Sequence, residues 1–351
     1  MRSESAGDPS PRPLRVTQKD LARKVGMTQA TVSLALNNHA KIPLETRALV
    51  QKIALEMGYR PDPYLSGLSA YRNQTRTHTY HGTLAWMSNW HQPTTSGWGG
   101  VNRWYFEGAT AHAAQLGYQI EEHALRARGM TPERLAQILQ ARGIQGILLP
   151  PQPQSGMEIS FPFDRFSVLT FGYTLAQPEF NTIALHHYRA VEMLFRKLIA
   201  LGYKRPGLAV RSEHDARVEC LWSAAFWSEQ RRLPVSRRVP LLLENSLARD
   251  GFLTWVERHK PDVIISSSDD AYKWMIQAGI GVPEKIGFTL LTAHADSYYS
   301  GIWQNLQLTG AKAVDSLIDM IHRGERGIPE VRSSILVDAT WLPGNTVRLP
   351  K

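Results

Sequence analysis

The strongest constraint on the fold is an alternation of short apolar runs and amphipathic segments from Tyr80 onward. Runs typical of buried strands occupy residues 83–88, 146–150, 166–172, 205–210, 262–268 and 287–291. Amphipathic segments typical of helices accompany them at residues 104–117, 131–142, 188–201 and 311–323. Because strands that alternate with helices form parallel sheets covered by those helices, the pattern predicts an α/β region, and its spacing favours two sheets.

Length and composition add broad limits. A chain of 351 residues exceeds one ordinary core, so two or three folding units are expected. Apolar residues make up 43% of the chain, yet no apolar run reaches the roughly 18 residues of a membrane span. Residues 1–15 lack the apolar centre of a secretory signal, and a single cysteine, Cys220, excludes an internal disulfide framework. These features predict a soluble cytoplasmic protein without membrane association.

The positive charge is concentrated near the N-terminus. The formal net charge is +9, and residues 1–78 hold 12 Lys and Arg against 6 Asp and Glu. A small basic module in an otherwise nearly balanced chain is typical of contact with a polyanion. On charge alone, a solvated basic surface without a partner is an equally good interpretation.

Three short helices are predicted between Val16 and Tyr59. Thr17 and Asp20 form a capping-box pattern at the first helix, and Gly26 is suited to end it. Thr28 can cap the second helix, which is expected to run to Asn37 and Asn38, and the third is expected between Pro43 and Gly58. Two helices joined by a tight turn and braced by a third form a helix-turn-helix unit.

The second helix has an unusual outer face. Val32, Ala35 and Leu36 make one apolar face, and the other face holds only small or uncharged residues, namely Gln29, Ala30, Ser33, Leu34 and Asn37. A plain three-helix bundle would normally expose Lys and Glu there. A helix that enters the major groove needs an outer face small enough to approach base edges and polar enough to read them. The pattern therefore favours DNA recognition.

The segment VTQKDLARKVGMTQATVSLALNN, followed by Thr46-Arg47 and by MGYRPDPYLSGLSAYR, resembles the LacI/GalR family of bacterial transcription regulators. The resemblance is close over residues 15–72 and looser beyond them. It implies that Gln29 and Ala30 read bases and that Ser33 and Asn37 contact flanking bases or the backbone. Leu34 stands where the family often has Arg, which removes a bidentate contact to guanine. The residues implied to grip phosphates are Thr17, Thr28, Thr46 and Tyr59.

Residues 60–76 have the composition of a linker, with two prolines and a glycine. The family resemblance implies that this segment folds into a hinge helix on DNA and that a leucine from each subunit enters the minor groove. Leu68 lies at that position, and Leu65 lies one turn earlier on the same face. Without the resemblance, a flexible tether is the simpler interpretation.

For the larger region the resemblance implies the periplasmic-binding-protein-like fold, with two lobes, three crossovers and an effector in the cleft. The first lobe is expected at roughly 78–187 plus 304–333, and the second at roughly 188–303 plus a C-terminal strand near 334–345. The predicted domains are a tail (1–14), a helix-turn-helix domain (15–60), a hinge (61–77) and an effector-binding and dimerisation domain (78–345).

Ligands of open α/β sheets bind beyond the carboxyl ends of the strands. This rule, together with the abundance of tryptophan near those ends, favours a small effector such as a sugar stacked on indole rings. The chain departs from the family's polar clamp, because Glu219, Ser268 and Thr292 stand where the family has Arg, Asn and an acidic residue. The alternative is therefore a degenerate pocket that senses no sugar. The predicted effector contacts are Trp86, Trp98, Arg217, Asp269, Trp303 and Gln304.

Motifs of catalysis are missing. The chain has no GxGxxG, no P-loop and no GxSxG elbow, and His186 and His187 are adjacent rather than four residues apart. No catalytic residue, metal or cofactor is predicted. Three classes remain. A homodimeric regulator, expected to be a repressor, that binds a near-palindromic DNA operator is favoured over a stand-alone ligand-binding protein and over an enzyme fused to a helix-turn-helix.

Overall fold

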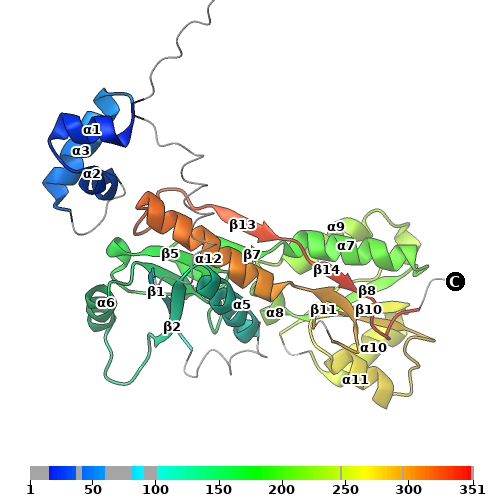
Figure 1. Cartoon of the computed structure of the whole chain (residues 1–351). Helices are drawn as coiled ribbons and strands as arrows, with labels where there is room; N and C mark the ends of the chain where they lie inside the picture. Colours follow the sequence, from blue (N-terminus) through cyan, green and yellow to red (C-terminus); the bar gives the residue numbers. More distant parts are fainter. Residues whose placement is uncertain are drawn as a thin grey trace, which may run out of the picture. The chain divides into compact units, whose positions relative to one another are not determined.

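The computed structural model describes residues 16–36, 42–59, 81–90, 101–245, 247–294 and 296–348 (Figure 1). The chain separates into two compact units, one holding residues 16–59 and the other nearly all the described residues from 81 onward. Within the described residues, no helix is long and apolar enough to cross a bilayer.

The N-terminal unit is a bundle of three helices, α1 (Gln18–Val25), α2 (Gln29–Leu36) and α3 (Leu44–Glu56). The capping box at α1 is present, because Thr17 and Asp20 each bind the other's backbone amide, and Gly26 ends the helix with a left-handed φ of 68°. Thr28 caps α2 through a 3.1 Å hydrogen bond from the Thr31 amide. The three predicted helices are thus confirmed, although the expected end of the second helix at Asn37 and Asn38 lies outside the described residues.

The core of this unit is small. Among the described residues of this unit, the buried apolar side chains come from the three helices and the approach to α3, and they are Leu21, Ala22, Val32, Ala35, Ile42, Val50 and Ala54. Arg47 donates to the Ile42 carbonyl at 2.8 Å and fixes the approach to α3.

The first lobe of the larger unit contains a six-stranded parallel sheet in the order β13-β7-β5-β3-β1-β2. Its strands are β1 (Gly82–Ser88), β2 (Tyr118–Ala124), β3 (Gly146–Leu149), β5 (Ser167–Phe171), β7 (Asn181–Leu185) and β13 (Ser334–Val337). Helices α5 (Val101–Gln115) and α12 (Leu306–Arg323) cover one face, and α6 (Pro132–Ala141) covers the other (Figure 1). A short side sheet pairs β4 (Met157–Glu158) with β6 (Leu175–Gln177), and a turn of 3-10 helix, η3 (Phe163–Arg165), precedes β5.

Two glycines let α5 and α12 cross in close contact. A Cβ at Gly108 would lie 2.0 Å from the Gln307 carbonyl oxygen, and a Cβ at Gly310 would lie 2.1 Å from the Tyr105 carbonyl oxygen. Neither position accepts a side chain without movement of a helix. This contact fixes the first turns of α5 and α12, which carry Trp104 and Gln307.

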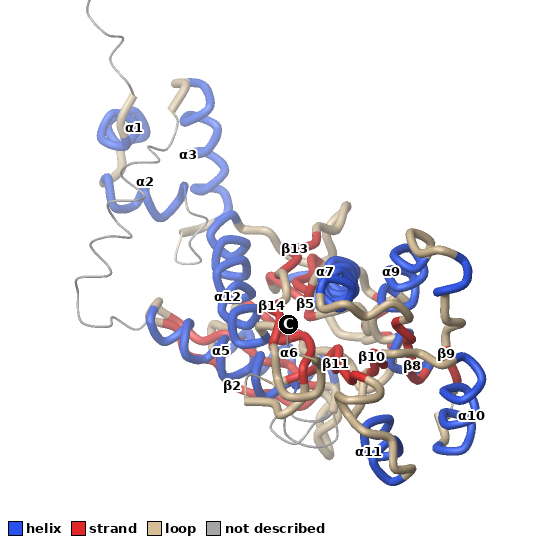
Figure 2. Tube along the Cα trace, turned by 90° about the vertical axis from the view of Figure 1, so that its right-hand side faces the viewer, coloured by secondary structure: helices blue, strands red, loops and turns tan. Residues whose placement is uncertain are grey.

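The second lobe holds another six-stranded sheet, in the order β14-β12-β11-β10-β8-β9, parallel except for β14. Its strands are β8 (Pro206–Arg211), β9 (Leu242–Glu244), β10 (Val263–Ser266), β11 (Gly287–Ala293), β12 (Ser300–Trp303) and β14 (Thr340–Leu342). Figures 1 and 2 show α7 (His187–Ala200) and α9 (Leu221–Gln230) side by side on one face, and α10 (Arg249–His259) and α11 (Asp270–Gln277) cover the other. The remaining elements are α8 (Ser212–Ala216) and η4 (Val235–Arg237).

The chain crosses between the lobes three times, after β7, after β12 and between β13 and β14. The predicted two lobes, three crossovers and six named strands are confirmed. The prediction of a single C-terminal strand in the second lobe is wrong for residues 334–337. Strand β13 pairs with β7 in the first lobe, and only β14 joins the second.

Candidate functional sites

The outer face of α2 is set by how the helix packs. Val32 and Ala35 are fully buried between α1 and α3, which leaves Gln29 and Ala30 exposed at the start of the helix. Ser33 and Leu34 are half-buried, and Leu34 packs partly against the core. No charged residue lies on α2. The exposed Gln29 amide can donate one hydrogen bond and accept another. These two groups complement the acceptor and the donor that an adenine edge presents in the major groove.

The predicted phosphate contacts are spread over the three helices. Thr17 and Thr28 are exposed at the starts of α1 and α2, while Thr46 and Tyr59 are half-buried on and beyond α3. The Thr17 hydroxyl lies 2.6 Å from Asp20 and the Thr28 hydroxyl 2.8 Å from Thr31, so both hydroxyls already serve the helix caps. Three further predicted contacts, Asn37, Leu65 and Leu68, lie outside the described residues.

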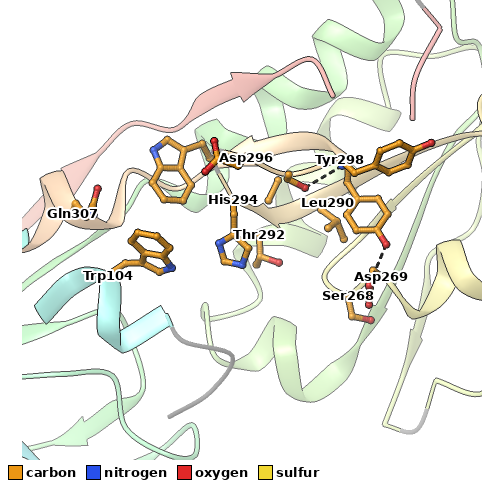
Figure 3. Close-up of a pocket in the computed structure, with 13 residues that line it drawn as sticks. Trp104, Ser268, Asp269, Leu290, Thr292, His294, Asp296, Tyr298 and Gln307 are labelled. Carbon is orange, nitrogen blue, oxygen red and sulfur yellow. Dashed lines mark hydrogen bonds between the residues drawn. The ribbon is translucent and has the colours of Figure 1, made fainter. Parts of the chain in front are cut away.

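A cavity of about 540 Å³ lies between the two lobes of the larger unit. The first lobe contributes Trp104 from α5 and Gln307 from α12, and the second lobe contributes the carboxyl ends of its strands and the loop after β11. Figure 3 shows Trp104, His294 and Gln307 at one end of the cavity and Ser268 and Asp269 at the other. The lining residues are Trp104, Ser268, Asp269, Leu290, Thr292, Ala293, His294, Asp296, Ser297, Tyr298, Tyr299, Trp303 and Gln307.

Aromatic rings dominate one end of this cavity. The indole of Trp104 meets that of Trp303 edge-on at 6.1 Å between centroids, and the His294 ring lies 6.3 Å from Trp104. At the other end, the Tyr299 hydroxyl donates to Asp269 at 3.1 Å. Burial, followed by the charge of Asp269, raises the pKa of Tyr299 to about 12. Tyr299 therefore stays a neutral donor at physiological pH.

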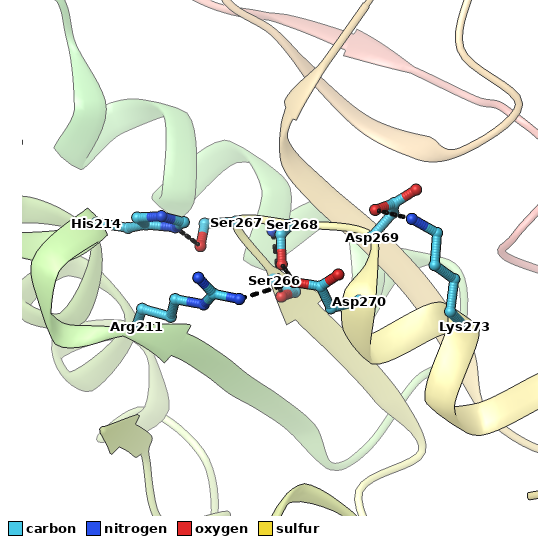
Figure 4. Close-up of polar contacts among 8 residues, drawn as sticks. All are labelled: Arg211, His214, Ser266, Ser267, Ser268, Asp269, Asp270 and Lys273. Atoms are coloured by element: carbon cyan, nitrogen blue, oxygen red, sulfur yellow. Dashed lines mark hydrogen bonds and ion pairs between the residues drawn. The ribbon is translucent and has the colours of Figure 1, made fainter. Parts of the chain in front are cut away.

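The polar residues beside the cavity are largely bonded to one another (Figure 4). Arg211 forms an ion pair with Asp270 at 3.0 Å, and Ser268 donates to the same carboxylate. His214 lies 2.8 Å from the Ser267 hydroxyl, and burial, followed by the charge of Arg211, lowers the pKa of His214. This network holds the ends of β8 and β10 together.

Arg217 joins the two lobes. Only 6% of the residue is exposed, and its guanidinium donates to the carbonyl oxygens of Pro153 at 2.8 Å and Gln152 at 2.9 Å, beyond the end of β3. Beside it, the Ser155 hydroxyl donates to the Ala216 carbonyl at 3.0 Å. Burial lowers the pKa of Arg217, and nearby Glu213 raises it. Arg217 thus bonds lobe to lobe and does not line the cavity.

The structure brings together only part of the predicted effector set. Asp269 and Trp303 line the cavity. Trp86 is a core residue with no exposure, packed against Phe106 and Phe171, and it does not line the cavity. Gln304 is buried and donates to the Leu291 carbonyl at 2.8 Å. Trp98 lies outside the described residues.

Several lining residues were missing from the predicted contacts. Trp104, His294, Asp296, Tyr298 and Tyr299 all face the cavity. The strand-end rule does point to the loop at 295–299, which follows β11, but sequence alone does not tell which of its side chains turn inward. Glu219, which replaces the family's clamping Arg, is exposed with a left-handed φ of 52° and lies outside the cavity lining.

Residues 17–62 match the family described as bacterial regulatory proteins, lacI family. The HTH-type transcriptional repressor CytR of Escherichia coli (strain K12) is 46% identical over 61 residues, which are 17% of this chain and 17% of that protein. Over residues 17–62 the chain is therefore similar to the lacI family. The match to the curated relative covers the N-terminal unit of this chain and only 17% of that protein.

Solved structures extend the likeness to nearly the whole fold. A transcriptional regulator CelR–cellobiose complex is 18% identical with a TM-score of 0.52, over 95% of this chain and 100% of that one. The lac repressor dimer bound to operator and the anti-inducer ONPF is 17% identical with a TM-score of 0.50, over the same shares. A periplasmic binding protein/LacI transcriptional regulator from Alkaliphilus metalliredigens QYMF, complexed with D-xylulofuranose, is 14% identical with a TM-score of 0.52, over 76% and 99%. At these identities the likeness shows the fold.

Proposed function

We propose that this chain is a homodimeric transcription regulator, a repressor without enzymatic activity, that binds a near-palindromic DNA operator under the control of a small molecule in the interlobe cleft. The observation that carries the proposal is the uncharged, exposed start of α2 in a module that matches the lacI family. Relatives of the same fold support it, since one is a repressor bound to operator and another is a regulator bound to cellobiose.

Selection from random double-stranded DNA with the full chain tests the proposal. A dimer is expected to select two half-sites related by a two-fold axis, because the symmetry of the protein is mirrored in the site. Affinity is expected to fall steeply as salt rises, since Lys and Arg displace counterions from the phosphates. If the selected DNA contains no palindromic site, the proposal that this chain is a DNA-binding regulator is wrong.

Gln29→Ala is expected to change which half-site the chain prefers. The loss of a bidentate contact to one base costs about 1–3 kcal/mol of discrimination at that base. Binding to scrambled DNA should stay unchanged, because that binding depends on phosphate contacts. The measurement is a titration of the selected operator, its single-base variants and scrambled DNA. Gln115→Ala, an exposed glutamine at the end of α5, is the matched control. Equal weakening on every sequence would instead make Gln29 a phosphate contact.

For the effector, we propose a ring-shaped small molecule, with a carbohydrate as the first class to screen. Trp104 and Trp303 offer apolar faces on which a sugar ring can stack, and Asp269 offers a hydrogen-bond acceptor. The competing proposal is a degenerate pocket, and the observation that favours it is Arg217, whose guanidinium is engaged by the first lobe. Calorimetry against a broad panel of sugars separates the two, because silence across the panel supports the degenerate pocket.

A further inference from the structure

The charge around the interlobe cavity is one-sided. The lining includes two carboxylates, Asp269 and Asp296, and one histidine, while no Lys or Arg belongs to the described lining. Two arginines of the second lobe are turned to other partners, since Arg211 pairs with Asp270 and Arg217 with carbonyls of the first lobe. Lys273 is bound to Asp269, so an anionic ligand would meet like charge at Asp296 and a cation that is already paired at Asp269.

The two carboxylates are not equivalent. Asp269 receives hydrogen bonds from Lys273 at 2.9 Å and from the Tyr299 hydroxyl at 3.1 Å, so its charge is partly compensated. Asp296 is exposed and makes no ion pair with any described residue. The uncompensated negative charge of the cavity therefore lies mainly on Asp296, which lies toward the Trp104 end in Figure 3.

Three hydroxyl donors that line the cavity are already engaged by other groups of the second lobe. The Ser268 hydroxyl donates to Asp270, and the Thr292 hydroxyl donates to the Ser267 carbonyl. The Tyr299 hydroxyl donates to Asp269. The lining also offers donors in Ser297, Gln307 and the two indoles, so hydrogen bonding alone does not separate a cation from a neutral ligand. The negative charge of Asp269 and Asp296 is what favours a cation.

Aromatic faces favour the same class of ligand. An indole ring attracts a cation through the negative potential of its face, most strongly where the cation is removed from water. Trp104 and Trp303 come from different lobes and meet edge-to-face within the cavity, so a ligand that contacts both rings contacts both lobes. Tyr298, which is 53% exposed, adds a third aromatic ring.

We propose that the ligand of this cavity is a small organic cation, a molecule whose protonated or quaternary nitrogen lies between the indole rings and Asp296. Among carbohydrates, this selects amino sugars over neutral sugars. The inference rests on the proposed role of the cleft as the effector site and narrows the effector to one charge class.

Calorimetry with the full chain tests the inference with pairs of probes that differ in charge. The pairs are choline with its neutral isostere 3,3-dimethyl-1-butanol, and glucosamine with glucose. At least one cation is expected to bind about tenfold or more tighter than its neutral partner, from the cation–aromatic and carboxylate attraction together. Neutral probes that bind as tightly as the cations, or cations that fail to bind at millimolar concentration, would overturn it.

Substitutions test which residues cause the preference for a cation over its neutral partner. Asp296→Asn is expected to remove most of the preference for the cation, and Trp303→Leu is expected to weaken cation binding. Asp250→Asn, which removes a charge from a 92% exposed side chain on α10, is the control and should leave the preference unchanged. If Asp296→Asn binds the cation as wild type does, the inference fails. The selection of operator DNA by the same preparation reports separately on the regulator, so failure of the charge preference and failure of DNA recognition are distinguishable.

Discussion

Leu21→Ala is expected to unfold the N-terminal module and abolish operator binding while the larger unit stays folded. Leu21 has no exposure and packs in a core of seven buried residues, three of which are alanines. Loss of a buried leucine side chain costs about 2–5 kcal/mol. A module of this size buries little surface, so a loss of about that amount is comparable to its whole stability.

The measurement combines operator titration with circular dichroism during thermal unfolding. Wild type and variant should share the transition of the larger unit, and the variant should lack the helical signal of the module. Leu55→Ala, which truncates an 84% exposed leucine on α3, is the matched control and should keep both properties. Operator affinity equal to wild type in Leu21→Ala would show that the module's stability does not depend on this core.

The N-terminal module could be predicted almost completely from sequence because its signals are local. The caps at Thr17 and Thr28 and the stop at Gly26 each depend on residues within three or four positions. The apolar spacing of α2 likewise fixes which face is buried once helical periodicity is given. Leu34 shows where this reasoning is least accurate. The sequence pattern places it on the outer face of α2, whereas in the structure it is half-buried and packs partly against the core.

For the larger unit, the sequence predicts where the strands lie in the chain, but it predicts less well which strands pair with one another. The run Leu84–Ser88 is buried on both faces, as a central parallel strand should be. Because such a run is apolar on both faces, the sequence does not show which way each side chain points. Trp86 packs toward α5 and α12, in the core of the first lobe, and the sequence does not distinguish this position from one that faces the cleft. Strand β13 joined the first lobe through pairing with β7, more than 140 residues earlier in the chain, and no local signal encodes such a choice.

The same limit applies to the cleft. The strand-end rule depends only on topology, and it points to Asp269 and to the loop after β11, both of which contribute to the cavity lining. It also points to Arg217, which does not line the cavity because its partners are carbonyls 64 and 65 residues away on the other lobe. A charged residue at a strand end is equally suited to a ligand and to a backbone carbonyl, and only the positions of the two lobes decide between them.

Arg217→Ala is therefore expected to loosen the contact between the two lobes. The substitution removes two hydrogen bonds from a charged donor, each contributing about 1.5–3 kcal/mol, and leaves the carbonyls of Gln152 and Pro153 without that donor. Arg217→Lys should rescue only in part, because an ammonium group cannot reproduce the planar fork that reaches two carbonyls. The readouts are the radius of gyration in small-angle X-ray scattering and the melting temperature of the larger unit.

Arg205→Ala is the matched control, because Arg205 also donates to backbone carbonyls, at 3.1 Å to Lys260 and 2.6 Å to His259, but within the second lobe. It should lower the melting temperature without an increase in the radius of gyration. If Arg217→Ala behaves in the same way, Arg217 stabilises its own surroundings and does not hold the lobes together. If the radius increases only for Arg217→Ala, any ligand that contacts both lobes should also bind that variant more weakly, because part of its binding energy must then close the cleft.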